Sequence, residues 1–194
     1  LKGRTELSED EKQRLGLPVF VKPARGGSSI GVSKVTTWEE FPTAVDLALE
    51  DDEKILVEPE IVGQEVEIGV LHYADGTLLA SVPALLAGID DSDEGFYGFD
   101  TKYLDNVVTA EIPAPFAPEL TEKLRDMAIR AFEALNCEGL SRVDFFVTEE
   151  SVYINEINTL PGFTPISMYP QVLAASGVEY PALLEALIEQ ALAK

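Results

Sequence analysis

Two alternating segments joined by a short polar turn constrain the fold of this chain more than any other feature. They are residues 141–147 and 151–158, with the turn at 148–150. Alternation of polar and apolar side chains is typical of a strand with one buried face, so the two segments are predicted to form an antiparallel hairpin. If the turn centres near Glu150, the numbers of facing residues sum to about 300. The sequence therefore predicts the register of the hairpin as well as its existence.

The predicted register brings four polar side chains to one face of the hairpin. Asp144 faces Glu156 and Arg142 faces Asn158, while the apolar residues between them point to the other face. Directly opposed carboxylates repel one another unless a cation lies between them. Two carboxylates and an amide oxygen are also the hard ligands that Mg²⁺ prefers. We therefore expect a magnesium site here; the alternative is a solvated polar face on a one-sided sheet.

The N-terminal part of the chain has the pattern of a small α/β lobe. A strand runs into Lys22, and the segment after it is too rich in glycine and serine for regular structure. The start of the helix that follows is marked either by a capping-box spacing at 37–40 or by Pro42 in its first turn. The expected order is strand, loop, strand, helix and strand, at residues 17–21, 24–31, 32–35, 44–50 and 54–57.

The remainder of the chain is predicted to form a larger lobe with strands and helices. Segment 65–71 alternates charged and apolar residues as a half-buried strand does, and Asp75-Gly76 signals a hairpin before a return strand at 77–82. The clearest helix spans 119–136, and Pro181 opens a last amphipathic helix. The chain is therefore expected to be an α+β protein of two lobes, residues 1–63 and 64–194.

Charge and composition exclude several classes of function. The chain carries 35 Asp and Glu against 14 Lys and Arg, a net charge of −21, and such a field repels nucleic acid. No apolar run approaches the ~18–20 residues of a membrane span. The single cysteine, Cys137, cannot form an internal disulfide, which fits a reducing cytoplasm. We therefore expect a cytoplasmic protein that binds neither nucleic acid nor membrane.

The loop after Lys22 indicates phosphate binding. A Gly/Ser loop can bring successive backbone N–H groups close to phosphate oxygens, and a nearby ammonium supplies charge. The loop is not a Walker A loop, because the lysine precedes the glycines and no Gly-Lys-Ser/Thr follows. By itself it reads equally well as a surface turn. Together with the magnesium face, it predicts a nucleotide site.

Several motifs together resemble a known family. The run from Val19 to Val32 resembles the phosphate loop of D-alanine–D-alanine ligases, members of the ATP-grasp superfamily. The stretches 102–104, 142–145 and 155–164 agree with that family in order and spacing, and the Glu-x-Asn-Thr-x-Pro-Gly run is specific to it and its D-alanine–D-lactate relatives. The resemblance covers the chain from Leu17 onward. It implies an ATP-grasp fold, with a small α/β lobe and a larger lobe whose mostly antiparallel sheet is flanked by helices.

The resemblance implies nucleotide contacts in the first part of the chain. The ATP phosphates would be bound by Lys22 and by the loop residues Ser28 and Ser29. The positions near the adenine and ribose match Glu58, Ile61 and Glu65. Between them, Pro59 and Glu60 depart from the Lys and aromatic pair that is commoner in the family, which leaves backbone groups of this linker as the expected adenine contacts.

The resemblance also implies catalytic and substrate residues in the second part. Two Mg²⁺ ions, with Mn²⁺ as a substitute, would be held by Asp144, Glu156 and Asn158. Negative charge on the transferred phosphoryl group would be stabilised by Arg142 and by the N–H of Gly162. The remaining matches are Ser167 and Met168, which would hold the carboxylate of the second substrate, and Lys102 and Tyr103 in a lid loop.

The reaction implied by the resemblance joins two D-alanines for peptidoglycan synthesis. ATP phosphorylates the carboxylate of the first, and the amine of the second attacks the resulting acyl phosphate. Such ligases carry an N-terminal domain that this chain lacks, so a fragment with weak or no activity alone is expected, and a homodimer is left open. The alternatives are another ATP-grasp carboxylate–amine or D-alanine–D-lactate ligase, and a nucleotide-binding module without catalysis.

Overall fold

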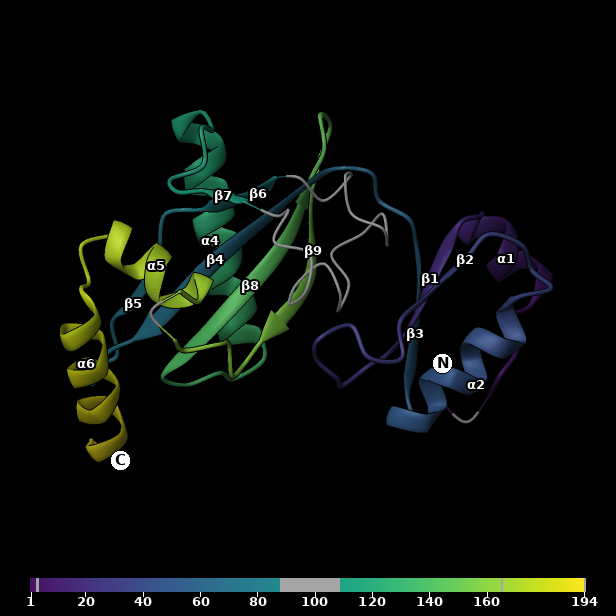
Figure 1. The fold of residues 1–194 in the computed structure, drawn as a ribbon, viewed down its shortest axis with the longest axis horizontal. Coiled ribbons are helices and arrows are strands. Elements are labelled where there is room, and N and C mark those ends of the chain that lie inside the picture. The colour runs from purple at the N-terminus through teal and green to yellow at the C-terminus, as the bar shows by residue number, and fades with distance from the viewer. Residues whose placement is uncertain (3, 88–108, 165, 194) are drawn as a thin grey trace. The chain divides into compact units, whose positions relative to one another are not determined.

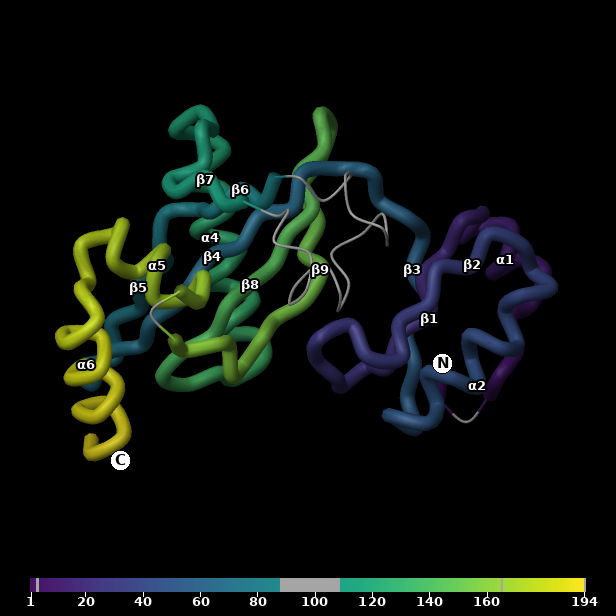
Figure 2. Tube along the Cα trace, in the orientation of Figure 1, coloured from purple at the N-terminus to yellow at the C-terminus, as the bar shows by residue number. Residues whose placement is uncertain are grey.

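The computed structural model of the chain consists of two compact units (Figures 1 and 2). It describes residues 1–2, 4–87, 109–164 and 166–193. Within these ranges the first unit comprises residues 1–61 and the second comprises 62–87 with 109–193. None of the helices in the described ranges combines the length and the apolar character that a membrane span requires. The expected lid residues Lys102 and Tyr103 lie outside the described residues.

The first unit is a three-stranded antiparallel sheet with a helix packed on one face. The order of its strands is β2-β1-β3. Its elements are α1 (Glu9–Leu15), β1 (Val19–Pro23), β2 (Ser33–Val35), α2 (Phe41–Asp51) and β3 (Ile55–Pro59). Alternate residues of β1, Val19 and Val21, are fully buried against Val45 of α2, which makes a separate small core. The predicted order of strand, loop, strand, helix and strand is confirmed.

Near the start of each helix of this unit, a glutamate side chain accepts hydrogen bonds from backbone N–H groups. Helix α2 starts with Pro42 in its first turn, and Glu40 reaches back to the N–H groups of Thr36 and Thr37, at 2.9 and 3.1 Å. Of the two starts left open by the sequence, the proline in the first turn is therefore correct. Helix α1 was not predicted, although Ser8 and Glu11 form a capping box at its start.

A buried aspartate fixes the beginning of the Gly/Ser loop. Asp52 follows α2, and its carboxylate accepts bonds from the Arg25 guanidinium at 2.7 and 3.0 Å. It also accepts from the backbone N–H groups of Arg25 and Lys54, at 2.8 and 3.0 Å. The hydrogen bonds from Arg25 hold the pKa of Asp52 well below its ordinary value. The loop therefore leaves the sheet from a fixed point.

The second unit is an antiparallel sheet covered by helices on both faces. The order of its main strands is β7-β6-β4-β8-β9, and β5 also pairs with β4. The strands are β4 (Gln64–His72), β5 (Leu78–Ala80), β6 (Ala84–Ala87), β7 (Thr109–Glu111), β8 (Leu140–Val147) and β9 (Val152–Asn158). The helices are α4 (Pro118–Ala134), α5 (Met168–Ala175) and α6 (Tyr180–Leu192). The predicted α+β class, with a mostly antiparallel sheet flanked by helices, is confirmed.

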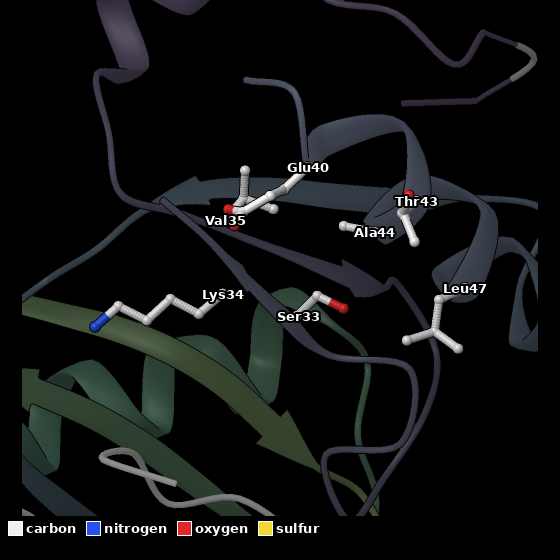
Figure 3. Close-up of a pocket in the computed structure, with 7 residues that line it drawn as sticks. All are labelled: Ser33, Lys34, Val35, Glu40, Thr43, Ala44 and Leu47. Atoms are coloured by element: carbon white, nitrogen blue, oxygen red, sulfur yellow. The ribbon is translucent and has the colours of Figure 1, made fainter. Parts of the chain in front are cut away.

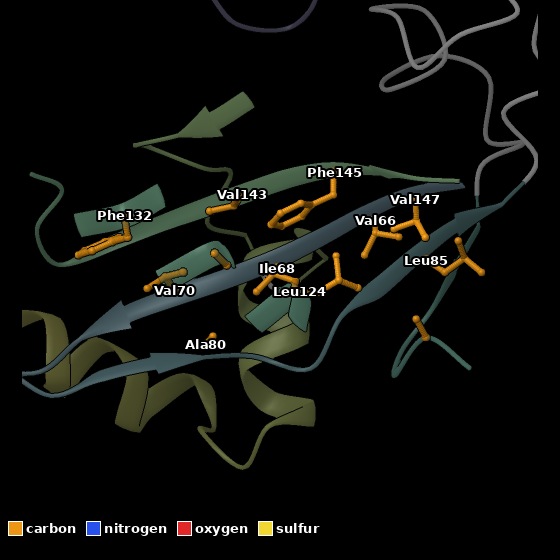
Figure 4. Packing of buried hydrophobic residues seen from close by; sticks show 12 residues of the cluster. Val66, Ile68, Val70, Ala80, Leu85, Leu124, Phe132, Val143, Phe145 and Val147 are labelled. Atoms are coloured by element: carbon orange, nitrogen blue, oxygen red, sulfur yellow. The ribbon is translucent and has the colours of Figure 1, made fainter. Parts of the chain in front are cut away.

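Helix α4 covers one face of this sheet (Figure 4). Its residues Leu124, Ala128 and Phe132 are buried against alternate side chains of the two central strands. These side chains are Val66, Ile68 and Val70 of β4 and Val143, Phe145 and Val147 of β8. The prediction that the apolar residues of the 141–147 segment point to a core is therefore confirmed.

The prediction that segment 65–71 is half-buried is wrong. Strand β4 lies between β6 and β8, and its residues from Val66 to Leu71 are buried on both faces. Helix α5 covers the second face at Gly69, where an added Cβ would lie 2.5 Å from Leu173 and 3.1 Å from the Tyr169 ring. The fully buried Tyr169 also donates its hydroxyl to the Val70 carbonyl, at 3.0 Å. The two alternating sets of side chains along β4 therefore pack on opposite faces of the sheet, one against α4 and the other against α5.

Replacing Gly69 with alanine is expected to destabilise the second unit by roughly 1–3 kcal/mol, the usual cost of adding a methyl group to a packed core. The nearest side chain, Leu173, is fully buried, so it can make room for the new methyl group only by repacking the core around it. Urea unfolding followed by circular dichroism measures the change. Gly27→Ala is the matched control, since a Cβ there meets nothing within 4 Å. Equal stability of the two variants would contradict the close approach of α5 to β4.

Replacing Asp52 with asparagine is expected to destabilise the first unit at pH 7 and to matter less in acid. Because the pKa of Asp52 is lowered by folding, its ionised form stabilises the fold above its ordinary pKa. That contribution is lost as the pH falls from about 4 towards the lower folded-state pKa. Urea midpoints of wild type and variant, compared at pH 7 and in acid, measure the difference. Asp46→Asn, on the exposed side of α2, is the control. A difference that is as large in acid as at pH 7 would contradict the assignment.

Candidate functional site

The hairpin of β8 and β9 has the predicted register where the polar residues lie. Arg142 faces Asn158 and Asp144 faces Glu156. Past Asp144 the register shifts by one residue in a β-bulge, so that Phe145 faces Ile154. The shift was not predicted, because the expected register came from a turn centred near Glu150, whereas Val147 faces Val152 and the connection comprises residues 148–151. The four polar residues nevertheless lie on one face of the sheet, opposite α4.

Arg142 is the centre of a half-buried cluster of charges on this face. Its Nε and Nη2 atoms donate to the two carboxylate oxygens of Asp144, both at 2.7 Å. The Nε atom also lies 3.2 Å from Oε2 of Glu67 on β4. Burial opposes the charge of Arg142, but its hydrogen bonds to Asp144 and the charges of Asp144, Glu67 and Glu156 raise its pKa. The guanidinium therefore stays charged at any physiological pH.

Glu67 was not predicted as part of the site. It faces Asp144 across β4 and β8, and its side chain is 4% exposed. The signal in the sequence was the two-residue spacing from Glu65, a predicted nucleotide residue on the same strand. The alternation of segment 65–71 predicted only a half-buried strand and gave Glu67 no role. A carboxylate at this depth needs a cationic partner, and Arg142 provides it.

The predicted magnesium ligands fit a hard cation by their chemistry. Asp144, Glu156 and Asn158 are all partly buried on the same two strands and offer two carboxylates and one amide oxygen. The amide oxygen of Asn158 accepts the N–H of Leu160 at 3.3 Å, which orients it. In the part of the chain that the structure describes, no group of three His, Cys, Asp or Glu side chains gathers as a metal site. This set is of another kind, since its third ligand is an amide.

The predicted phosphate residues lie in the first unit. Lys22 is on the face of the small sheet opposite α2, and its Nζ atom lies 2.8 Å from the Glu58 carboxylate. In the loop, Ser28 and Ser29 have φ angles of 55° and 56°, in the left-handed region that residues with a side chain rarely adopt. Two such residues in succession cost conformational free energy, and backbone strain of this kind is concentrated at functional sites. The predicted residue Ile61 is half-buried at the end of this unit.

The remaining predicted residues lie in the second unit. Glu65 is half-buried near the start of β4, where it faces Phe146 of β8. Gly162 and Ser167 are close together, since a Cβ on Gly162 would lie 3.0 Å from Ser167 Oγ. Ser167 precedes α5 and accepts the N–H of Thr164 at 3.0 Å. Met168 packs against the core under α5. The structure thus brings Gly162 to the residues expected to bind the second substrate.

A pocket elsewhere in the first unit lacks these features (Figure 3). It has a volume of about 280 Å³ and lies between β2 and α2. Its lining includes Lys34, which pairs with Glu60 at 2.6 Å, and Glu40, which caps the turn before α2. None of the predicted site residues lines it, so the candidate functional residues remain those of the polar face of β8 and β9 in the second unit and those around Lys22 in the first.

Comparison with known proteins agrees with these features. Residues 1–189 match the family model described as D-ala D-ala ligase C-terminus. The chain is 65% identical to the D-alanine–D-alanine ligase of Corynebacterium efficiens over 192 residues, which are 99% of this chain and 53% of that protein. The chain therefore spans about half the length of the curated relatives it matches.

Solved structures of similar proteins have the same fold. The D-alanine–D-alanine ligase of Coxiella burnetii superposes with a TM-score of 0.81 at 37% identity, over 99% of this chain and 50% of that one. The D-alanine–D-alanine ligase of Bacillus anthracis complexed with ATP gives 0.77 at 26% identity, over 99% and 58%. With a family model matched over nearly its whole length, this chain belongs to the family of D-alanine–D-alanine ligase C-terminal regions.

Proposed function

We propose that this chain is the ATP-using part of a ligase that joins two D-alanines to D-alanyl-D-alanine. The observation that carries the proposal is the polar face on which Arg142 lies among Asp144, Glu156 and Asn158. A cation and hard-oxygen ligands on one face are what phosphoryl transfer to a carboxylate requires. The names of the relatives and the ATP complex of the Bacillus anthracis ligase support the same reading.

The proposed reaction has two steps. The γ-phosphoryl group of ATP is transferred to the carboxylate of the first D-alanine, which gives ADP and an acyl phosphate. The amine of the second D-alanine then attacks the acyl carbon, and phosphate leaves as the peptide bond forms. A carboxylate at neutral pH is a poor electrophile, so the first step is the one that ATP has to drive. Charge neutralisation and positioning are the main demands of that transfer.

The proposal assigns separate roles to residues of the first unit and of the second. Lys22 and the backbone of the loop with Ser28 and Ser29 bind the phosphates of ATP, and the segment from Glu58 to Ile61, with Glu65, binds the nucleoside. Arg142 stabilises the charge of the transferred phosphoryl group, and its bonds to Asp144 keep the guanidinium oriented. The lid residues Lys102 and Tyr103 would exclude water from the acyl phosphate.

Two Mg²⁺ ions, or Mn²⁺ in their place, would be held by Asp144, Glu156 and Asn158, and when bound they supply positive charge to the phosphates of ATP. The second D-alanine would bind at the start of α5. Ser167 and the backbone of Met168 would hold its carboxylate there, and the nearby N–H of Gly162 would stabilise the oxyanion.

The proposal extends to the longer protein and its cellular role. Because the chain spans about half of its relatives, binding of the first D-alanine would need the N-terminal domain, and the chain alone would be weakly active or inactive as a ligase. The dipeptide would serve peptidoglycan synthesis in the cytoplasm, where ATP is available. A homodimer is compatible with this account but does not carry it.

Replacing Glu156 with glutamine is expected to weaken Mg²⁺-dependent ATP binding about tenfold or more, because the metal loses a charged ligand. Titration calorimetry of the chain with ATP, with and without Mg²⁺, measures this. The matched control is Glu149→Gln, in the exposed turn of the same hairpin. If the Glu156 variant bound Mg²⁺ and ATP like wild type, the metal assignment would be wrong. If wild type bound no ATP, the proposal that this chain binds a nucleotide by itself would be wrong.

A further inference from the structure

Glu67 is a buried carboxylate that the predicted set of site residues does not include. It lies on β4, the central strand of the larger sheet, and faces Asp144 of β8. Its side chain is 4% exposed, against 13% for both Arg142 and Asp144. Removing a carboxylate from water to this extent is costly unless a cation compensates it. The Nε atom of Arg142, at 3.2 Å, is that cation.

The guanidinium of Arg142 therefore lies against two carboxylates that differ in exposure. Arg142 and Asp144 form a bidentate pair, in which Nε donates to one carboxylate oxygen and Nη2 donates to the other. Both oxygens of Asp144 are thus in use by Arg142 in this structure. Each of these oxygens has a second lone pair, so a metal ion bound by Asp144 would share the carboxylate with Arg142 and weaken its hold on the guanidinium. Glu67 is the deeper of the two carboxylates and lies outside the predicted metal ligands, so its ion pair with Arg142 is unaffected by the metal.

We propose that Glu67 is a positioning residue for Arg142. When Asp144 turns to a metal ion, Glu67 retains the Nε atom of Arg142, and the guanidinium stays beside the phosphoryl group that is transferred. The inference rests on the proposed function, since it concerns the proposed catalytic arginine. A purely structural role for Glu67, as a buried ion pair between β4 and β8, predicts the same proton exchange but different ligase kinetics in the experiments below.

The first experiment follows the Nε–H proton of Arg142 by ¹⁵N NMR and needs no enzymatic activity. In an Asp144→Asn variant, Glu67 should still protect this proton from exchange with water. Adding Glu67→Gln to that variant should then speed the exchange by about tenfold or more, because the ionised partner 3.2 Å from Nε is lost. If Asp144→Asn alone exchanged as fast as the double variant, Glu67 would not hold Arg142 and the inference would be overturned.

The second experiment measures ligase kinetics in the full-length protein that contains this chain. Glu67→Gln should lower kcat by about tenfold to a hundredfold, while the KM for ATP stays within about twofold. Glu67→Asp, which keeps the charge, should recover part of the lost kcat. The matched control is Ser141→Ala, a fully buried neighbour of Arg142 whose hydroxyl has no hydrogen-bond partner among the described residues. It should leave kcat unchanged.

The outcomes separate this inference from the proposed function. Unchanged kcat in Glu67→Gln, or an equal loss in Glu67→Gln and Ser141→Ala, would overturn the positioning role. If the wild-type protein had no ligase activity, the proposed function would fail, and the exchange of the Arg142 proton would still decide whether Glu67 holds this guanidinium. Recovery by Glu67→Asp shows that the charge is needed, and a lower kcat with an unchanged KM for ATP supports positioning over a purely structural ion pair.

Discussion

The guanidinium of Arg142 is the interaction on which the larger unit depends. It lies between Asp144 and Glu67, on neighbouring strands of one sheet, and allows two carboxylates to be buried side by side. Without that charge, each carboxylate would carry an uncompensated cost of burial where the two strands face each other. The same charge is what phosphoryl transfer needs at its reacting group. The positive charge of Arg142 is therefore required both for the stability of the larger unit and for the proposed chemistry.

The layers around that interaction explain why it is held so firmly. Helix α4 covers the apolar face of β4 and β8, and α5 reaches the other face because Gly69 has no side chain there. The polar cluster is thus left on the part of the second face that α5 does not cover. In the first unit, Asp52 does the corresponding work by fixing the start of the Gly/Ser loop through Arg25. In each unit a buried carboxylate holds an arginine: Asp52 holds Arg25 in the first unit and Glu67 holds Arg142 in the second.

Much of the fold was predictable because local patterns determined it. The alternation along 141–147 and 151–158 predicted which residues share a face, and the turn centred near Glu150 predicted the pairing of Asp144 with Glu156. The two-sided burial of β4 was not predictable from the alternation of its residues, because it depends on α5, which lies a hundred residues away in the chain. For the same reason Glu67 was missed: its role appears only when β4 is placed beside β8. The β-bulge after Asp144 was not predictable either, because no residue in the sequence marks the position of the register shift.

The central claim, that the polar face of β8 and β9 holds a divalent metal with its nucleotide, is tested most directly with Mn²⁺. This ion broadens the NMR signals of nuclei near it, so spectra of the ¹⁵N-labelled chain with ATP and substoichiometric Mn²⁺ locate the bound metal. The account predicts that broadening is strongest at the amides of Asp144, Glu156 and Asn158 and weak on exposed acidic helices such as α1. Broadening spread evenly over acidic surface residues, with no maximum on β8 and β9, would contradict it.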